Sequence, residues 1–594
     1  MSYPRLSSEI SAVGDYARGD LDWDPMVLQH RGFTASGVFK QLAKYIMTTD
    51  GTDIYISNSY QVIYGGPNDA GGIDGDDADA TAILTQAMTD VAATGGIIYV
   101  AEGTFMFDIT GKGNPLMVLP PNVNLIGAGI DATIFKAKGT MPDLGIGLFI
   151  MHANSSLQNL TVDMDGDNLT WLGSYTPASW FGAVSIGNYL HGVTNDPGTD
   201  AYVNNAKFIN CDAAAGVTNI SGLGLNVLYG KGIKVRNVSF YNCYAGQFIT
   251  YQPTTTQTEL SNQWYDIDGV YAENCYVGVY WEIGSANLKH VTTRDCTVGI
   301  LINAEPSSWT YGTIENPTLI NCSGGGIVMN GPVEWIKIVN PHVDGTGAAA
   351  WGIRYVGKAG STCTISNPTL LNCGEGFRAN DAGVVTWNGG RIYNANSFGV
   401  FASADITLKG CEIENSGTHG VYITHAGGSS NIGIIEGCNI HDNTNDGVRL
   451  DGASYVTVQG NSIRNNDVGV REMSVSDYNL ISENILKSNT TADIAYVGTH
   501  TKILSSNIGV YTPQGTADAS GVATILSGAT AIVVTHGCSF TPALKDITVM
   551  LGEDPTNTPG AIWISAIGAT TFNINCENDP GASNLDVAWV IRRV

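Results

Sequence analysis

An Asn-Cys or Asp-Cys pair recurs along the middle of the chain, and its spacing restricts the fold more than any other feature of the sequence. The steps between successive pairs are 32, 32, 21, 26 and 51 residues, and the last is about twice 26, so one occurrence is skipped. A period in the twenties is typical of stacked structural repeats. The cysteines of these pairs are Cys211, Cys243, Cys275, Cys296, Cys322 and Cys373.

Each repeat consists of a short β-rich run, the Asn-Cys corner, a glycine and another short run, as in residues 268–282 and 288–303. These runs are too short and too rich in β-branched residues for helices, which excludes leucine-rich and ankyrin repeats. The pattern predicts an all-β parallel solenoid whose coils stack at about 4.8 Å. Asparagines stacked at a corner tolerate left-handed backbone and bond to their neighbours in the stack.

Composition excludes several other classes of protein. The 594 residues are 43% hydrophobic and 14% charged, which is too apolar for disorder. A net charge of −26 disfavours nucleic acid as a partner. The chain begins without a secretion signal and has no apolar run long enough to span a bilayer, so we expect assembly in a cytoplasm and no membrane insertion.

The 11 cysteines show no Cys-x-x-Cys spacing. We interpret them as an interior row of small apolar side chains, in preference to disulfides, a metal site or redox chemistry. No metal and no cofactor are expected.

Ahead of the repeats, the acidic segment 73–78 leads into an amphipathic pattern that predicts a helix near 79–93, with Asp79 as its N-cap. Because an open solenoid end exposes unpaired strand edges, we expect this helix to cover that end. The acidic segment could instead hold calcium. It lacks the regularly spaced ligands and the final glutamate of a calcium-binding loop, so a role in capping the solenoid is preferred. A strand and turn follow at residues 95–105.

This opening resembles that of the pectate-lyase-like superfamily of right-handed parallel β-helices and, within it, the phage tailspikes. Alternating strands at 528–549, 571–575 and 587–591 are similar to the C-terminal β-sandwich that closes a tailspike homotrimer. His536, within that pattern, is interpreted as a structural histidine. The residues that match the family's opening are Asp74, Gly75, Asp79, Ala82, Ile83, Gly95, Gly96, Gly103 and Phe105.

The resemblance implies an elongated homotrimer on a phage virion, assembled in the host cytoplasm, that binds a bacterial surface polysaccharide. It divides the chain into a segment 1–65 that attaches to the phage tail or baseplate or forms a neck, a β-helix over 66–508, and a trimerising β-sandwich over 509–594. Within the first segment, the sequence predicts a helix over 33–47 and a strand over 54–57.

Aligning the repeats on the glycine after the corner predicts which side chains face solvent. The second and fourth residues after this glycine point outward because strand side chains alternate. The resulting face is polar and rich in aromatic rings, which suits a polysaccharide, and the alternative is a merely solvated sheet face. The predicted substrate-binding residues are Tyr251, Trp264, Tyr280, Trp281, Asn303, Trp309, Tyr311, Asn330, Arg354 and Arg378.

Glycoside hydrolysis needs two carboxyl groups. Glu282 and Glu305 lie 23 residues apart, about one coil, and are the predicted catalytic pair; the alternative for Glu305 is a turn residue before Pro306. Asp266, Asp268 and Asp295 are reserves, because a trimer can also build its site between subunits.

Two other functions stay open. A lyase would need a base and cations that neutralise a uronate, for which His290, Lys289, Arg354 and Arg378 are candidates. Elimination ranks second because no cationic cluster coincides with the aromatic-rich region. The third reading is an adhesin that holds the glycan without cutting it.

Overall fold

The structure is a computed structural model. It describes residues 43–49, 53–58, 62–65, 79–111, 116–140, 147–170, 174–187, 198–212, 218–228, 230–250, 264–282, 284–304, 310–331, 333–345, 350–357, 360–381, 383–424, 432–504, 506–509, 518–538, 541–552 and 557–592.

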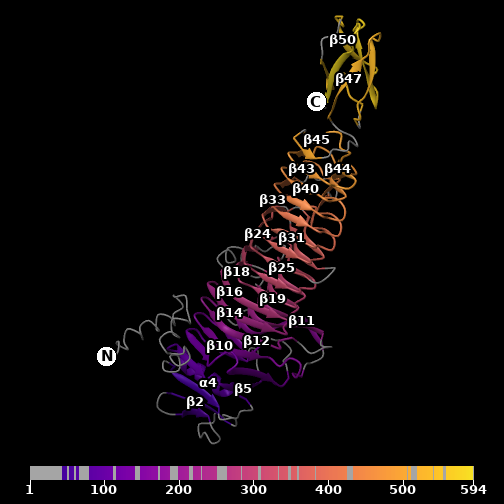
Figure 1. Ribbon diagram of the computed structural model, residues 1–594. Helices are drawn as coiled ribbons and strands as arrows, with labels where there is room; N and C mark the ends of the chain where they lie inside the picture. The colour runs from indigo at the N-terminus through magenta and orange to yellow at the C-terminus, as the bar shows by residue number, and fades with distance from the viewer. Residues whose placement is uncertain are drawn as a thin grey trace, which may run out of the picture. The chain divides into compact units, whose positions relative to one another are not determined.

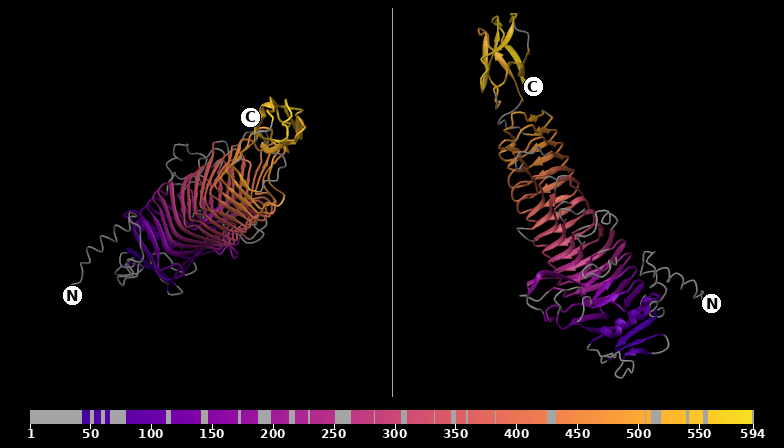
Figure 2. Two further views of the ribbon diagram at one scale, coloured as in Figure 1. Left: turned by 45° about the horizontal axis from the view of Figure 1, so that its top comes forward. Right: turned by 180° about the vertical axis from the view of Figure 1, so that it is seen from behind.

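The chain divides into two compact units, Met1–Ile365 and Ser366–Val594. In each unit, short parallel strands stack coil upon coil, so that segments about one repeat apart in sequence lie side by side (Figure 1 and Figure 2). Each coil contributes strands to three faces of the solenoid. The predicted parallel β-solenoid is therefore confirmed.

The first face of unit one is formed by β6 (Met117–Leu119), β9 (Phe149–Met151), β11 (Ser174–Ile186), β13 (Thr218–Val227), β15 (Ala245–Ile249), β17 (Val277–Trp281), β20 (Val298–Asn303), β23 (Gly325–Asn330) and β26 (Trp351–Gly357). The second face comprises β4 (Gly96–Val100), β7 (Val123–Gly127), β18 (Gly284–Lys289), β21 (Thr310–Glu315), β24 (Val333–Val339) and β27 (Thr362–Ser366). The third face comprises β5 (Gly103–Asp108), β8 (Thr133–Lys138), β19 (Thr292–Arg294), β22 (Thr318–Ile320) and β25 (His342–Asp344). Four longer strands run through the second and third faces: β10 (Ser156–Asp163), β12 (Tyr202–Ile209), β14 (Ile233–Tyr241) and β16 (Trp264–Glu273).

Unit two repeats this plan. Its first face is β29 (Glu375–Asp381), β32 (Val400–Ala402), β35 (Val421–Thr424), β38 (Val448–Asp451), β41 (Val468–Met473) and β44 (Ala492–Ala495). Its second face is β30 (Val384–Asn388), β33 (Asp405–Lys409), β36 (Gly433–Glu436), β39 (Val456–Gln459), β42 (Leu480–Ser482) and β45 (Lys502–Ile503). Its third face is β28 (Thr369–Leu371), β31 (Arg391–Tyr393), β34 (Glu412–Glu414), β37 (Asn439–His441), β40 (Ser462–Arg464), β43 (Ile485–Lys487) and β46 (Ile508–Gly509).

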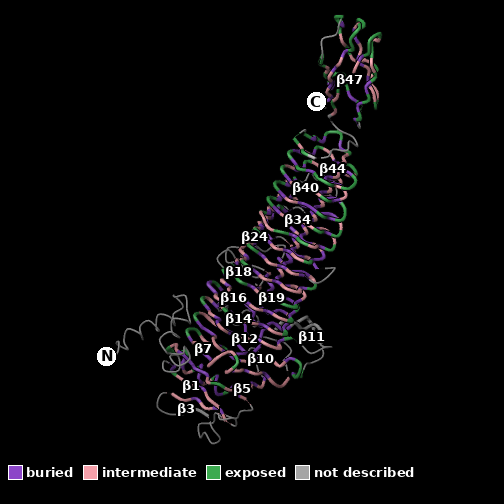
Figure 3. Tube along the Cα trace, viewed as in Figure 1, coloured by how far each residue is buried: buried purple, intermediate pink, exposed green. Residues whose placement is uncertain are grey.

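Buried residues alternate with more exposed ones along the strands, as the colours of the tube in Figure 3 show, because strand side chains alternate between the interior and the surface. The corners follow the predicted asparagine pattern. Asn210, Asn242 and Asn321 adopt φ of 54°, 54° and 56°. The Asn242 amide donates to the side-chain oxygen of Asn210 at 3.0 Å, and Asn321 donates in the same way to Asp295 at 3.0 Å. Each corner is thus fixed by the one in the adjacent coil.

The cysteines line the interior. All 11 are free and buried. Cys243, Cys275 and Cys296 follow one another in a column, since the N–H of Tyr276 donates to the carbonyl of Cys243 and the N–H of Thr297 to that of Cys275, both at 3.1 Å. Burial raises the pKa of the Cys243 thiol, and the hydrogen bond with Cys243 raises the pKa of Cys275. The column confirms that these residues occupy consecutive coils. In the described part of the chain, no cluster of His, Cys, Asp or Glu is suited to hold a metal ion.

The predicted helix exists as α4 (Thr81–Ala92), whose buried face includes Ile83, Leu84 and Met88. The expectation that Asp79 is its N-cap was wrong by one residue. Ala80 occupies that position, because its carbonyl oxygen accepts the N–H of Leu84 at 3.1 Å, the first hydrogen bond of the helix. The Asp79 carboxylate instead accepts the backbone N–H of Thr81 at 3.0 Å. The acidic segment 73–78 lies outside the described residues.

Among the described residues before α4 are the strands β1 (Tyr45–Thr49), β2 (Ile54–Ser57) and β3 (Val62–Gly65). The predicted strand at 54–57 is confirmed. The predicted helix is wrong over 45–47, where β1 pairs antiparallel with β2 and parallel with β4, and pairing on both edges outweighs local helical preference. The rest of that helix falls mostly outside the described residues. None of the described helices is long and apolar enough to cross a membrane.

The C-terminal region forms two three-stranded antiparallel sheets. One contains β47 (Asp518–Ile525), β52 (Leu585–Arg592) and β49 (Ile547–Leu551), and the other contains β48 (Ala531–Thr535), β51 (Thr571–Cys576) and β50 (Ile562–Ser565). Residues of both sheets share one apolar core, which includes Ile525, Phe572 and Trp589. His536 is buried there, where one ring nitrogen accepts the N–H of Cys538 at 3.0 Å and the other lies 3.2 Å from the carbonyl oxygen of Gly568.

Candidate functional site

The outward row of the first face has the predicted register in unit one. Strand pairing aligns Phe248, Tyr280, Leu301, Val328 and Arg354 across β15, β17, β20, β23 and β26. This row is less exposed than expected. Tyr280 is only 7% exposed, because it packs against the ring of Phe248 at 4.8 Å and belongs to an apolar cluster on the face.

Trp281 is 0% exposed, which corrects the expectation that its ring is offered to a ligand. As the third residue after the glycine it points into the solenoid, beneath the second face. A Cβ added at Gly312 would lie 2.9 Å from the Trp281 ring and 1.9 Å from the carbonyl oxygen of Ala286. Trp281 therefore supports the floor of the second face, and Gly312 leaves room for it.

Glu282 follows β17 at the corner between the first and second faces. Its carboxylate accepts a hydrogen bond from the Thr250 hydroxyl at 2.5 Å. The Tyr280 hydroxyl hydrogen-bonds to Glu282 and accepts from the amide of Asn303 at 3.1 Å. Burial, followed by the nearby charge of Glu282, raises the pKa of Tyr280. Asn303 pairs with Asn330 in the next coil, so both predicted asparagines lie in the row of Glu282.

The reserve carboxylates lie elsewhere and have their own partners. Asp266 forms an ion pair with Arg236. Asp268 lies 2.7 Å from the Nδ1 of His290, a residue predicted for the lyase alternative. Asp295 is a corner residue that accepts a hydrogen bond from Asn321.

The two predicted arginines belong to different units. Arg354 lies over the ring of Trp351 at 4.5 Å in unit one. In unit two, Arg378 lies 3.0 Å from Glu375 and over the ring of Phe401 at 4.3 Å. Each guanidinium is thus engaged within its own unit. Three further predicted residues, Tyr251, Glu305 and Trp309, lie outside the described residues.

The second face of unit one carries an outward row that contains both remaining predicted aromatic residues. Strand pairing aligns Trp264, Ser285, Tyr311 and Trp335 across β16, β18, β21 and β24. Trp264 is 45% exposed and Trp335 is 71% exposed. The next outward row is polar and aligns Asp266, Asn287, Thr313 and Lys337, with the Thr313 hydroxyl donating to Asn287 at 2.8 Å.

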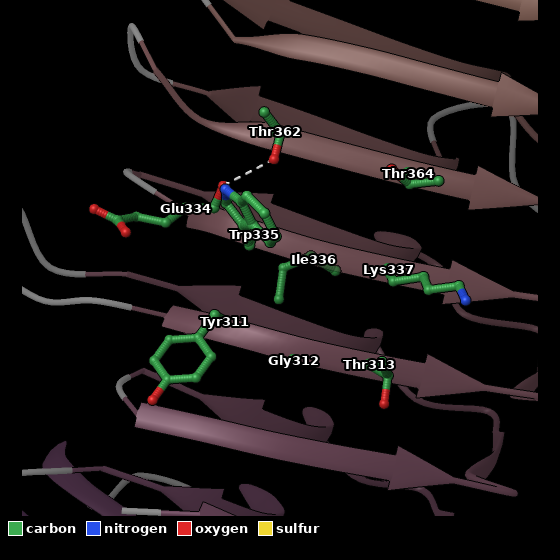
Figure 4. Close-up of a pocket in the computed structure, with 9 residues that line it drawn as sticks. All are labelled: Tyr311, Gly312, Thr313, Glu334, Trp335, Ile336, Lys337, Thr362 and Thr364. Atoms are coloured by element: carbon green, nitrogen blue, oxygen red, sulfur yellow. Dashed lines mark hydrogen bonds between the residues drawn. The ribbon is translucent and has the colours of Figure 1, made fainter. Parts of the chain in front are cut away.

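A groove of about 590 Å³ lies over β21, β24 and β27 at the end of these rows. We call it the Trp335 groove. Figure 4 shows Tyr311, Glu334, Trp335 and Thr362 at one end, and Thr313, Lys337 and Thr364 at the other. The residues that line it are Tyr311, Gly312, Thr313, Glu334, Trp335, Ile336, Lys337, Thr362 and Thr364.

Of the residues that line this groove, only Tyr311 was predicted as a site residue. Trp335 is followed by alternating apolar and charged residues, which mark it as outward-facing, but it lies beyond the aromatic-rich segment on which the prediction concentrated. The groove joins the Glu282 corner through Thr310, whose hydroxyl donates to the backbone carbonyl of Glu282 at 3.0 Å.

The comparisons with known proteins agree with the architecture. Residues 351–509 match the family model described as right handed beta helix region. No curated protein matches the chain.

Similar solved structures include the tailspike of E. coli bacteriophage HK620 in complex with a pentasaccharide, which is 11% identical with a TM-score of 0.42 over 87% of this chain and 90% of that chain. A variant of that tailspike in complex with a hexasaccharide is 11% identical, with a TM-score of 0.44 over 96% and 100% of the two chains. The A-module of the Azotobacter vinelandii mannuronan C-5 epimerase AlgE6 is 16% identical, with a TM-score of 0.28 over 73% and 96%. These similarities concern the fold alone. The family match covers residues 351–509, and the stacked coils described above show that the parallel β-helix fold also extends through the earlier part of the described chain.

Proposed function

We propose that the chain binds a bacterial surface polysaccharide along the second face of unit one and hydrolyses it. The observation that carries this proposal is the row of Trp264, Ser285, Tyr311 and Trp335 beside a polar row. Aromatic faces pack against sugar rings, and amide and hydroxyl groups bond to sugar hydroxyls. Since the rows run from coil to coil, the glycan would lie along the solenoid axis, across the strands.

In this proposal Glu282 is one of the two carboxyl groups that hydrolysis requires, and Glu305 is the partner favoured by the sequence. The hydroxyls of Thr250 and Tyr280 orient the Glu282 carboxylate from one side. Asn303 and Asn330 extend its row toward later coils and offer amide groups to sugar hydroxyls.

The resemblance to tailspikes supports a further set of proposals. The chain would form a homotrimer on the virion, attached by its N-terminal segment, with α4 covering the first coil. Exposed apolar side chains on the C-terminal sheets suit contacts between subunits, because a soluble protein rarely leaves large apolar patches uncovered. The exposed large apolar residues in and beside these sheets are Val522, Leu526, Val533, Leu544, Met550, Leu551 and Trp563. A single-chain mass in light scattering would contradict the trimer.

The function is tested with purified bacterial capsular polysaccharides and O-polysaccharides. New reducing ends without ultraviolet-absorbing product support hydrolysis, whereas unsaturated, absorbing ends indicate the lyase alternative. Binding without either product indicates the adhesin.

Glu282→Gln should lower the cleavage rate by about 10²–10⁴-fold and leave binding intact. A control is Glu436→Gln, which removes only an exposed ion pair with Lys409 at 2.9 Å in unit two. If Glu282→Gln cleaves the polysaccharide as fast as the unaltered chain, Glu282 is not a catalytic residue.

A further inference from the structure

Glu334 occupies an irregular position in β24. Thr310 of β21 pairs with Val333, but the next residue, Tyr311, pairs with Trp335. Glu334 is therefore an extra residue, a β-bulge, with no direct partner in β21. Bulges redirect a side chain and are frequent beside active sites.

The bulge changes the direction in which Glu334 points. Ile336 is buried and Trp335 is exposed, so strict alternation would turn residue 334 into the core together with Ile336. Because of the extra residue, Glu334 and Trp335 both reach the surface and both line the Trp335 groove. Figure 4 shows the Glu334 side chain at the same end of the groove as Tyr311, with Lys337 at the other end.

The surroundings of Glu334 shift its ionisation toward the protonated form. Partial burial raises the pKa of Glu334. In the part of the chain that the structure describes, no hydrogen bond or ion pair compensates its carboxyl group, and the groove's cation, Lys337, lies away from it (Figure 4). The backbone of Glu334 is held in place, since its carbonyl accepts the Thr362 hydroxyl at 3.2 Å.

Backbone contacts through Thr310 connect the start of β24, where Glu334 lies, to the corner that carries Glu282. Thr310 donates to the carbonyl oxygen of Glu282 and pairs directly with Val333, the neighbour of Glu334. The two glutamates thus lie two coils apart, a rise of about 10 Å at roughly 4.8 Å per coil. A rise of this size leaves room between the two side chains for the water molecule that an inverting glycosidase activates.

We propose that Glu334, rather than Glu305, is the second catalytic carboxyl group, the proton donor to the glycosidic oxygen of a glycan bound in the Trp335 groove. This rests on the proposed hydrolysis. Protonated Glu334 gives its proton to the glycosidic oxygen as the bond from that oxygen to the anomeric carbon breaks, and the bonding electrons stay on the departing oxygen. A water molecule adds its oxygen to the anomeric carbon, and the released proton passes to the Glu282 carboxylate.

The test compares full-length Glu334→Gln and Glu334→Asp with the unaltered chain. A matched control is Glu315→Gln, an outward carboxyl of β21 that does not line the groove. The probes are the purified polysaccharide that the unaltered chain cleaves and a nitrophenyl glycoside of its repeating unit, whose leaving group departs without a proton.

Glu334→Gln should slow cleavage of the polysaccharide by about 10²–10⁴-fold and that of the nitrophenyl glycoside by less than about tenfold. Activity that depends on a protonated acid falls as pH rises through the pKa of that acid. Glu334→Gln should therefore lose the fall in activity at alkaline pH, whereas Glu334→Asp, which keeps a carboxyl group, should still show such a fall. Glu315→Gln should match the unaltered chain.

Polysaccharide cleavage by Glu334→Gln within about twofold of the unaltered chain would overturn the assignment, as would an equal loss on both probes. If these variants keep full activity while Glu282→Gln is inactive, hydrolysis stands and Glu334 is not the donor. An unaltered chain that cleaves no polysaccharide would contradict the proposed function itself, and the role of Glu334 with it.

Discussion

Replacing Asn484 with alanine should destabilise the coils of unit two by about 3 kcal/mol. Asn484 is 0% exposed and belongs to an interior ladder with Asn461 and Asn507. Its side-chain oxygen accepts the backbone and side-chain N–H groups of Asn461 at 3.0 and 2.9 Å. Its amide donates to the carbonyl of Val458 at 2.9 Å and to the side chain of Asn507 at 3.0 Å.

The magnitude follows from the groups that alanine leaves unpaired. The Asn461 side-chain amide keeps a bond to the Ile435 carbonyl at 2.9 Å, but its buried backbone N–H loses its acceptor. Asn507 and Val458 each lose a donor. An unsatisfied buried polar group costs about 1–3 kcal/mol, and the buried N–H contributes most of the expected loss.

Hydrogen exchange of the Asn461 amide measures this directly. A loss of about 3 kcal/mol corresponds to roughly a hundredfold faster exchange. Ser462→Ala is the control, because among the described residues the half-exposed side chain of Ser462 in β40 has no hydrogen-bond partner, and the change should alter stability by less than about 0.5 kcal/mol. Unchanged exchange at Asn461 in Asn484→Ala would refute the view that the interior ladder holds these coils together.

Three further predictions concern other parts of the chain. The 11 buried thiols should resist a thiol reagent at about pH 8 until denaturant is added, because burial raises the pKa values of thiols such as Cys243, and fast reaction of the folded chain would contradict the interior column. Asp446 is buried, which raises its pKa, but hydrogen bonds with His419 and Arg471 outweigh this and lower it. Its contribution to stability is therefore complete above the unfolded pKa of about 3.9 and is lost as pH falls through the lower folded value. Asp446→Asn should lower the thermal stability of unit two at neutral pH and flatten its decline in acid, and a melting curve unchanged at both pH values would refute this. Trp335→Ala should weaken binding of a cleaved polysaccharide about three- to tenfold in calorimetry, whereas Trp563→Ala in the C-terminal sheets should not, and equal effects would place the glycan elsewhere.

The repeat made the solenoid predictable. Only small residues fit the interior corner column, so Cys243, Cys275 and Cys296 recur once per coil, and asparagine recurs where the backbone turns left-handed. Trp335 and Lys337, which were not among the predicted residues, follow the same alternation within β24 and face outward.

The exposure of the site was harder to predict. Alternation shows on which side of a strand a residue lies, but not what covers it, and Tyr280 is covered by Phe248 from the adjacent coil. The bulge at Glu334 depends on how β24 pairs with β21, a relation between coils that one strand's sequence does not contain. Pattern alone would have turned Glu334 inward.

The most direct test of the account is a crystal structure of full-length Glu334→Gln soaked with an oligosaccharide cut from the polysaccharide that the unaltered chain degrades. We expect sugar density along Trp264, Tyr311 and Trp335, running from coil to coil, with a glycosidic oxygen beside residue 334. Ordered sugar bound only on another face or on the C-terminal sheets would contradict it.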